Sequence, residues 1–344
     1  MEDIFWSLDS NSHNCSEATQ FCGFQTAEYF GMLYIHTPIT VFGLITNILN
    51  LVMFTRGRQK LAQWGSLYVF LVSLAAVDLG VMMIAAPFGF FSCLPSMSGT
   101  RASAIYRIYL FTPIANFFAT ASVWITTTMT IERYLAIRTL TCRRQFTSSH
   151  ARFAVASLLI ASLVLNLPFY FVERVDGAGD AYRTDFGESD VFLPYTWVRA
   201  TLAKFLPILL VFMANALLLA AIARSKLRRR RLVFPSATAQ TTRQSQRAQR
   251  NRDLLDLKCV SMLAGMSVTL LLCHGLEPFV QPYFIENVAM KPCFVYTQTY
   301  RNVLMLVTVL ETFSYASNFL FYFLCNTTLR KVFVDVFCSA RKRP

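Results

Sequence analysis

Residues 31–54 read GMLYIHTPITVFGLITNILNLVMF, and no charged residue occurs between Glu28 and Arg56. A helix that crosses the hydrocarbon core of a bilayer needs about 20 mostly apolar residues. This stretch is therefore long enough to cross a membrane without burying a charge. Six further long apolar windows follow it, so that the predicted spans lie near 31–54, 66–91, 105–137, 152–172, 195–223, 254–285 and 300–324. Four of them hold a charged residue in their interior: Asp78, Lys204 near the outer end of its span, Glu277 and Glu311.

The composition agrees with lipid as the solvent of this chain. Of its 344 residues, 55% are hydrophobic and only 15% are charged, although the net charge is +13. Soluble domains carry about 25% charged residues, so disorder is excluded and a soluble nucleic-acid-binding protein is disfavoured. We predict an all-α membrane protein with an extracellular tail (1–30), a seven-transmembrane helix bundle (31–325), and an interfacial helix with a short cytoplasmic tail (326–344).

The distribution of charge predicts the orientation. If the N-terminus lies outside, the inner segments hold 24 of the 32 Lys and Arg residues against four acids, a sum of +20. The outer segments hold seven bases against 12 acids, a sum of −5. Because basic residues favour the cytoplasmic side, we predict a multi-pass plasma-membrane protein with its N-terminus outside and its C-terminus in the cytoplasm.

Several predicted modifications fit this orientation. Asn14-Cys15-Ser16 is a glycosylation sequon on the outer tail. Four cysteines face the oxidising side and allow two disulfides, with three pairings open: Cys15, Cys22, Cys93 and Cys293.

The segment after the last span has an apolar stripe at helical spacing, formed by Leu329, Val332, Phe333, Val336 and Phe337. The stripe favours an amphipathic helix on the inner leaflet over an ordinary basic tail, and Cys338 at its end is a candidate for palmitoylation. We therefore expect membrane lipid as a partner, and no nucleic acid.

Four short motifs occur in order along the spans: GLITN at 43–47, LAAVD at 74–78, ERY at 132–134 and NFLFY at 318–322. Together, in matching spans, they resemble the rhodopsin-like (class A) G-protein-coupled receptors. Phe319 stands where that family usually has proline. This variant resembles FMRFamide-type and other invertebrate neuropeptide receptors. The resemblance implies a receptor, not an enzyme, that signals through a heterotrimeric G protein.

The resemblance also implies two sets of functional residues. One is a polar pocket around Asp78 that holds an allosteric sodium ion, the only cofactor we expect, and consists of Asp78, Asn47, Ser122, Ser314 and Asn318. A protonated Asp78 that only bonds neighbouring helices is the alternative. The other set is the activation switch: Glu132, Arg133, Tyr134, Asn318, Tyr322 and Pro278.

Two departures from the family concern the outer half. The family has a tryptophan shortly before the proline of the sixth span, but the run from Cys273 to Pro278 contains none. Ile108 occupies the place of the cysteine at the outer end of the third span, and the second outer loop contains no cysteine either. The usual covalent link between that loop and the third span is therefore absent.

Outer polar and aromatic positions predict the ligand class. Ala115 in place of a carboxylate argues against an amine, and a seventh span without lysine excludes a retinal Schiff base. The acidic outer loops favour a small basic peptide, amidated forms included, whose arginine binds Glu277 and Glu311. The candidate ligand-binding residues are Asn116, Glu277, Gln281, Tyr300, Thr308, Glu311 and Trp197.

Several alternatives stay open. Glu311 joins the Asp78 network in one of them, and Glu277 satisfies backbone donors at the proline kink in another. A chemosensory receptor of the same fold for a small molecule is the nearest alternative function. A transporter or channel is less favoured because the chain has no internal repeat.

Overall fold

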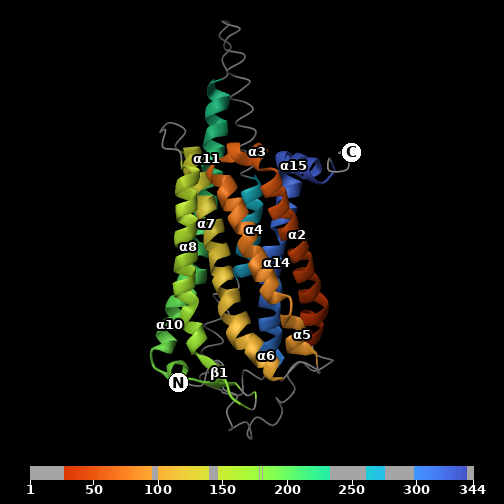
Figure 1. Cartoon of the computed structure of the whole chain (residues 1–344). Helices are drawn as coiled ribbons and strands as arrows, with labels where there is room; N and C mark the ends of the chain where they lie inside the picture. The colour runs from red at the N-terminus through yellow and green to blue at the C-terminus, as the bar shows by residue number, and fades with distance from the viewer. Residues whose placement is uncertain are drawn as a thin grey trace.

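The computed structural model describes residues 27–94, 100–138, 146–177, 179, 181–232, 261–275 and 298–338. Within them the chain is almost entirely helical, and the long helices run side by side along one axis (Figure 1). This arrangement is the bundle that the charge-free windows predict.

The elements of the bundle follow the predicted spans in order. They are η2 (Gly31–His36), α2 (Thr37–Arg56), α4 (Ser66–Ala85), η4 (Tyr106–Ala115), α7 (Asn116–Arg138), α8 (Ser148–Asn166), η6 (Thr201–Phe205), α11 (Leu206–Leu232), the helix Ser261–His274 and α14 (Gln298–Cys325). The shorter elements are α1 (Ala27–Phe30), α3 (Arg58–Leu61), η3 (Ala62–Trp64), α5 (Phe88–Cys93), α6 (Arg101–Ile105), η5 (Leu167–Phe171), β1 (Glu173–Val175), β2 (Ala181–Arg183), α9 (Asp185–Glu188), α10 (Phe192–Ala200) and α15 (Thr327–Phe337).

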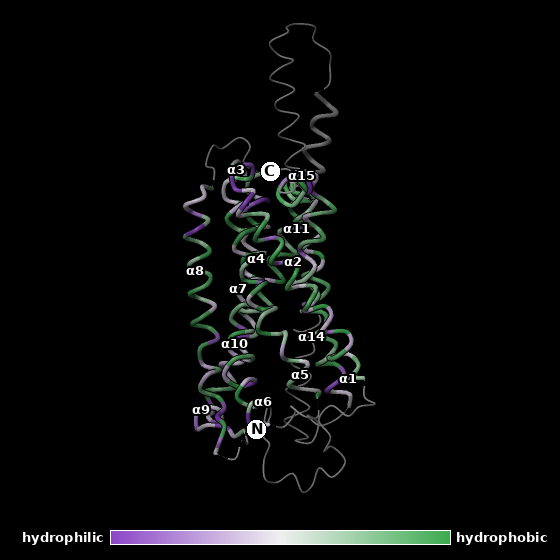
Figure 2. Tube along the Cα trace, turned by 45° about the vertical axis from the view of Figure 1, so that its right-hand side comes forward, coloured by the Kyte–Doolittle hydropathy of each residue, from purple (hydrophilic) through white to green (hydrophobic). Residues whose placement is uncertain are grey.

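The outward faces of the helices are apolar. Six of the described helices are long and apolar enough to cross a bilayer, and Ser261–His274 is a shorter apolar helix inside the predicted sixth span. Hydrophobic residues dominate the length of the bundle in Figure 2. Phe153 and Leu324 are 77% and 70% exposed. Such exposure of large apolar side chains is unfavourable in water and favourable against lipid tails.

The helices differ in how deeply they are packed. Half of the most apolar part of α4 is buried, against 17% for α8, so α4 lies at the centre of the bundle and α8 at its edge. A continuous core fills the half near α3 and α15, where Phe54, Phe70 and Ile125 are fully buried. This core gives the polar residues around it fixed positions.

In the half of the bundle away from α15, which the charge distribution predicts to be the outer half, the first, third and fifth spans contain π-helical segments: η2, η4 and η6. Pro113 lies inside η4, and Pro207 follows η6 in α11. A proline cannot donate the usual backbone hydrogen bond, so the wider π-helical turn is one way for the helix to continue past it. Single π-helical turns often occur at functional sites.

Two elements close the ends of the bundle. At the outer end, β1 and β2 form an antiparallel hairpin in which Glu173 faces Arg183. At the other end, α15 lies across the bundle (Figure 1), and two residues of its predicted apolar stripe, Leu329 and Val332, are buried. Lys60 also forms an exposed ion pair of 2.6 Å with Asp335 of α15.

Candidate functional site

The end of the bundle near α15 contains an ion pair on α7. The Arg133 guanidinium donates to both oxygens of Glu132, with Nε 2.5 Å from Oε2 and Nη2 2.8 Å from Oε1. Ser66 at the start of α4 donates its hydroxyl to Glu132 at 2.9 Å and accepts from Arg133 at 3.3 Å. Ser66 therefore ties this pair to the neighbouring helix.

Asp78 lies at the middle of the bundle and is fully buried. Its Oδ1 accepts a hydrogen bond from Ser122 of α7 at 2.5 Å, and its Oδ2 accepts one from the Asn318 amide of α14 at 2.6 Å. Both carboxylate oxygens are thus satisfied, as burial requires. The three residues connect the second, third and seventh spans.

The other members predicted for the Asp78 pocket bond elsewhere. Asn47 donates to the backbone carbonyls of Gly43 and Tyr315 at 3.0 and 3.3 Å, which joins α2 to α14. Ser314 is buried, and among the described contacts its carbonyl accepts from Ser317. The structure therefore brings Ser122 and Asn318, but neither Asn47 nor Ser314, into hydrogen-bond contact with Asp78.

Two tyrosines of the predicted switch have different surroundings. Tyr322 is 1% exposed, and its hydroxyl has no hydrogen-bond partner among the described residues. Its ring packs edge-on against Phe54 with centroids 5.6 Å apart. Tyr134 is half-buried beside the Arg133 pair. A third switch residue, Pro278, lies outside the described residues.

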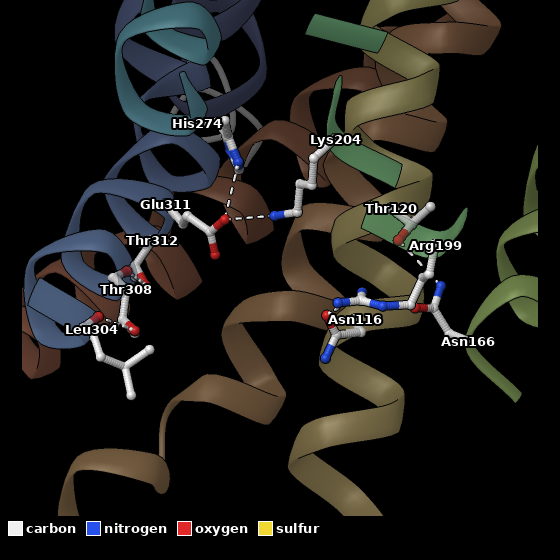
Figure 3. A network of polar contacts seen from close by, with 10 residues as sticks. All are labelled: Asn116, Thr120, Asn166, Arg199, Lys204, His274, Leu304, Thr308, Glu311 and Thr312. Atoms are coloured by element: carbon white, nitrogen blue, oxygen red, sulfur yellow. Dashed lines mark hydrogen bonds and ion pairs between the residues drawn. The ribbon is translucent and has the colours of Figure 1, made fainter. Parts of the chain in front are cut away.

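The outer half of the bundle contains a second ion pair, drawn in Figure 3. Lys204 of η6 donates from Nζ to the Glu311 Oε1 of α14 at 2.5 Å. His274 is fully buried, and its Nδ1 lies 3.3 Å from the same oxygen without the geometry of a hydrogen bond. This cluster joins the fifth, sixth and seventh spans.

A second cation of the fifth span lies one turn further out. The guanidinium of Arg199 in α10 donates to the Asn116 side-chain oxygen at 3.2 Å and lies 4.7 Å from the centre of the Phe169 ring. Beside it, Asn166 of α8 donates to Thr120 of α7 at 3.1 Å (Figure 3). Predicted ligand residue Asn116 is thus already in contact with Arg199.

The remaining predicted ligand residues are scattered. Trp197 is 38% exposed, and the cation–π contact at this level involves Phe169 instead. Thr308 donates to its own helix at Leu304, 2.9 Å away (Figure 3). Glu277 and Gln281 lie outside the described residues, as do Asn14, Cys15, Cys22 and Cys293. Tyr300 and Cys93 belong to described helices, but their side chains lie outside the described part, and Cys338 is an exposed free cysteine.

The outer hairpin is attached to the third span by charge. Arg107 of η4, next to Ile108, lies 3.4 Å from the Glu173 carboxylate of β1. Burial raises the pKa of Glu173, although the guanidinium groups of Arg107 and Arg183 lower it. Gly179, with a φ of 105°, forms the hairpin turn against Arg101 of α6, where a Cβ atom would lie 3.0 Å from the Arg101 Cβ. An ionic and packed contact thus occurs where the covalent link is absent.

Sequence reasoning missed the two pairs of the outer half. It placed Lys204 at the outer end of a span and Glu311 as an acceptor for a ligand. One signal was present: Lys204 is a base well inside the fifth predicted span, where it needs an acid within reach. Asp78 and Glu277 offered the same charge as Glu311, so the sequence did not identify the partner.

Comparisons with known proteins agree with this geometry. A family model described as the 7 transmembrane receptor (rhodopsin family) matches residues 46–322. The probable G-protein coupled receptor B0563.6 of Caenorhabditis elegans is 23% identical over 319 residues, which cover 88% of this chain and 68% of that protein. A second protein of that organism, the probable G-protein coupled receptor AH9.1, is 22% identical over 340 residues, which cover 92% of this chain and 78% of that protein.

A likeness to a solved structure concerns the fold. The crystal structure of squid rhodopsin superposes with a TM-score of 0.67 at 14% identity, over 92% of this chain and 87% of that one. At this identity the likeness shows how the helices are arranged and says nothing about the ligand. The predicted seven-helix bundle is therefore confirmed as the fold.

Proposed function

Because the chain belongs to the rhodopsin family of seven-transmembrane receptors, we propose that a ligand binding in its outer half makes it activate a heterotrimeric G protein. The chain is a multi-pass membrane protein and a receptor rather than an enzyme. The ligand that we propose is a small peptide, and the partner at the other end of the bundle is the G protein.

One observation carries the proposal: the closed ion pair between Glu132 and Arg133, supported by Ser66. A pair of this kind is a two-state element, because Arg133 either stays with Glu132 or leaves it for another partner. A ligand shifts the equilibrium only if it binds the open form more tightly. Release of Arg133 toward the G protein is the open form that we propose.

The outer half supports a ligand that carries charge. Arg199, Lys204 and Glu311 all reach the interior there (Figure 3), and each makes a contact that a polar ligand can replace. Backbone and side-chain groups of a peptide match such a site better than a neutral odorant does.

A sodium ion fits the pocket around Asp78. The oxygens of Asp78 and Ser122 converge there, and a turn of the Asn318 amide would present its oxygen in place of its nitrogen. Carboxylate, hydroxyl and amide oxygens are the ligands that hard cations prefer. The ion would supply positive charge that holds the three spans in the resting arrangement.

We place the N-terminus outside and the C-terminus in the cytoplasm, in line with the charge distribution. Under this orientation Asn14 carries a glycan, the four outer cysteines are able to pair, and Cys338 is palmitoylated at the end of α15. Lipid headgroups contact the basic residues that flank the spans.

The proposal is tested by guanine nucleotide exchange on a panel of G-protein α subunits, in membranes that contain the full chain. We expect peptides from a screen of free-acid and amidated forms to stimulate exchange, and Arg133→Ala to abolish the response at unchanged surface expression. Normal signalling by Arg133→Ala would contradict the mechanism. A response confined to small odorants, unaffected by Glu311→Gln, would favour the chemosensory alternative.

A further inference from the structure

The ion pair of Lys204 with Glu311 is deeply placed and short. The Lys204 side chain is 6% exposed and that of Glu311 is 22% exposed, with 2.5 Å between Nζ and Oε1. Attraction between charges grows as the surroundings lose water, so leaving one member of this pair without a partner costs more than it would on the surface. Glu311 is the more accessible partner.

A ligand with a single charge gains little from this pair. A cation that binds Glu311 must displace Lys204, whose ammonium then loses its contact with that carboxylate in a nearly dry position. An anion that binds Lys204 separates Glu311 from its partner in the same way. Removing one member of a buried pair is costly because the other charge stays behind. A ligand that carries both charges avoids this cost, since each protein group exchanges one partner for another.

The surrounding charges favour a ligand that adds a carboxylate. Among the described residues drawn in Figure 3, Arg199 and Lys204 are the cations and Glu311 is the acid. A lone arginine of an amidated peptide would enter beside two positive groups and repel them. A carboxylate added with that arginine instead faces Lys204, with Arg199 about one turn away on the same span.

We propose that this pair recognises a peptide with a free carboxyl-terminal arginine. The ligand's cation donates to Glu311 and its terminal carboxylate accepts from Lys204, so the two charges of one terminal residue separate the fifth span from the seventh. The inference rests on the proposed receptor function and narrows it to non-amidated basic peptides.

The experiment uses a library of pentapeptides that end in arginine, each made as a free acid and as an amide, with matched peptides that end in alanine. Exchange on the G-protein panel is measured in membranes that contain the full chain. We expect a subset of the arginine free acids to stimulate exchange, and each to be at least about tenfold more potent than its amide and its alanine counterpart.

Variants then assign the response to the pair. Lys204→Met and Glu311→Gln should each lower the potency of the active free acids by about 100-fold. The exchanged variant, Lys204→Glu with Glu311→Lys, restores an ion pair within the bundle and should recover surface expression and part of the potency if either single variant folds poorly. Lys60→Met and Asp335→Asn are matched controls, because they break an ion pair of similar length that is 60% and 50% exposed at the other end. We expect them to change potency less than about twofold.

Several results would overturn the inference. They are equal or greater potency of the amides, equal potency of the alanine peptides, unchanged potency in both single variants, and no response to any peptide of the library. A response to amidated peptides or other ligands that still depends on Arg133 would leave the proposed function standing. Normal signalling by Arg133→Ala would instead contradict the proposed function itself.

Discussion

At the scale of single residues, Ser66 has the clearest expected effect. Its hydroxyl bonds both members of the Glu132–Arg133 pair. A hydrogen bond to a charged group contributes about 1.5–3 kcal/mol, so Ser66→Ala should weaken the closed form and raise basal nucleotide exchange by about tenfold. Exchange is measured without ligand at matched surface expression.

Ser317→Ala provides the control for this prediction. Ser317 is also buried, but its hydroxyl donates within α14 to the Ser314 carbonyl. We expect its basal exchange to match that of the wild type. A rise in Ser317→Ala as large as that in Ser66→Ala would contradict a specific role for the contact between α4 and α7.

At Tyr322 we expect a substitution to change signalling without lowering thermal stability. Its buried hydroxyl has no hydrogen-bond partner among the described residues, so Tyr322→Phe should leave the Tm unchanged or slightly higher while ligand-stimulated exchange falls. Tyr106→Phe is the contrast, because the Tyr106 hydroxyl donates to the Ile84 carbonyl and its loss should lower the Tm. A clear loss of thermal stability in Tyr322→Phe would show that its hydroxyl acts in the resting state.

Single residues also show how much of the candidate site the sequence predicts. The positions of Asp78, Ser122 and Asn318 followed from motifs whose register is fixed along each helix, and they do meet in space. The partner of Lys204 did not follow, because it depends on how the fifth span is rotated toward the seventh. Hydropathy carries no information on that rotation.

At the scale of elements, α15 depends on the residue that precedes it, Asn326. The Asn326 side chain accepts hydrogen bonds from the amides of Thr328 and Leu329 at 3.0 and 3.2 Å, as helix caps do. Asn326→Ala should cost about 0.5–2 kcal/mol and increase hydrogen exchange in α15. Asn326→Ser keeps an accepting oxygen and should stay close to the wild type. Equal exchange in both variants would argue that packing of α15 alone holds it in place.

The outer hairpin should respond to acid. The pKa of Glu173 is raised by burial, so folding of the hairpin takes up a proton at this carboxyl. The stabilisation is complete below the ordinary pKa of about 4.3 and is lost as the pH rises through the raised value. We expect the Tm of the purified receptor to fall from pH 4 to about pH 7 by more in the wild type than in Glu173→Gln. Parallel profiles of the two proteins would contradict the prediction.

Elements differ in how well the sequence predicts them. Long charge-free windows predicted the spans because each must satisfy its backbone within a helix in lipid. The hairpin has three residues per strand, too few for a periodic signal. Its position depends on the contacts of Glu173 with Arg107 of η4 and of Gly179 with Arg101 of α6. The π-helical turns have no pattern of their own in the sequence either.

At the scale of the whole molecule, charge predicts which face looks outward. With +20 on the inner segments and −5 on the outer ones, an N-terminal tag should bind antibody on intact cells, and a C-terminal tag only after permeabilisation. Asn14→Gln should remove the mass shift caused by deglycosylation. Asn326-Thr327-Thr328 is also a sequon but lies on the inner side in this orientation, so Asn326→Gln should leave the shift unchanged. Labelling of the C-terminal tag on intact cells would reverse the orientation.

The non-covalent attachment of the outer hairpin has a practical consequence. The loop between Glu173 and Trp197 contains no cysteine, so a reducing agent cannot detach it. Its attachment includes Arg107, whose side chain is 26% exposed and therefore within reach of dissolved ions. The outer loop should therefore stay attached in the presence of thiol reagents, while high ionic strength loosens it.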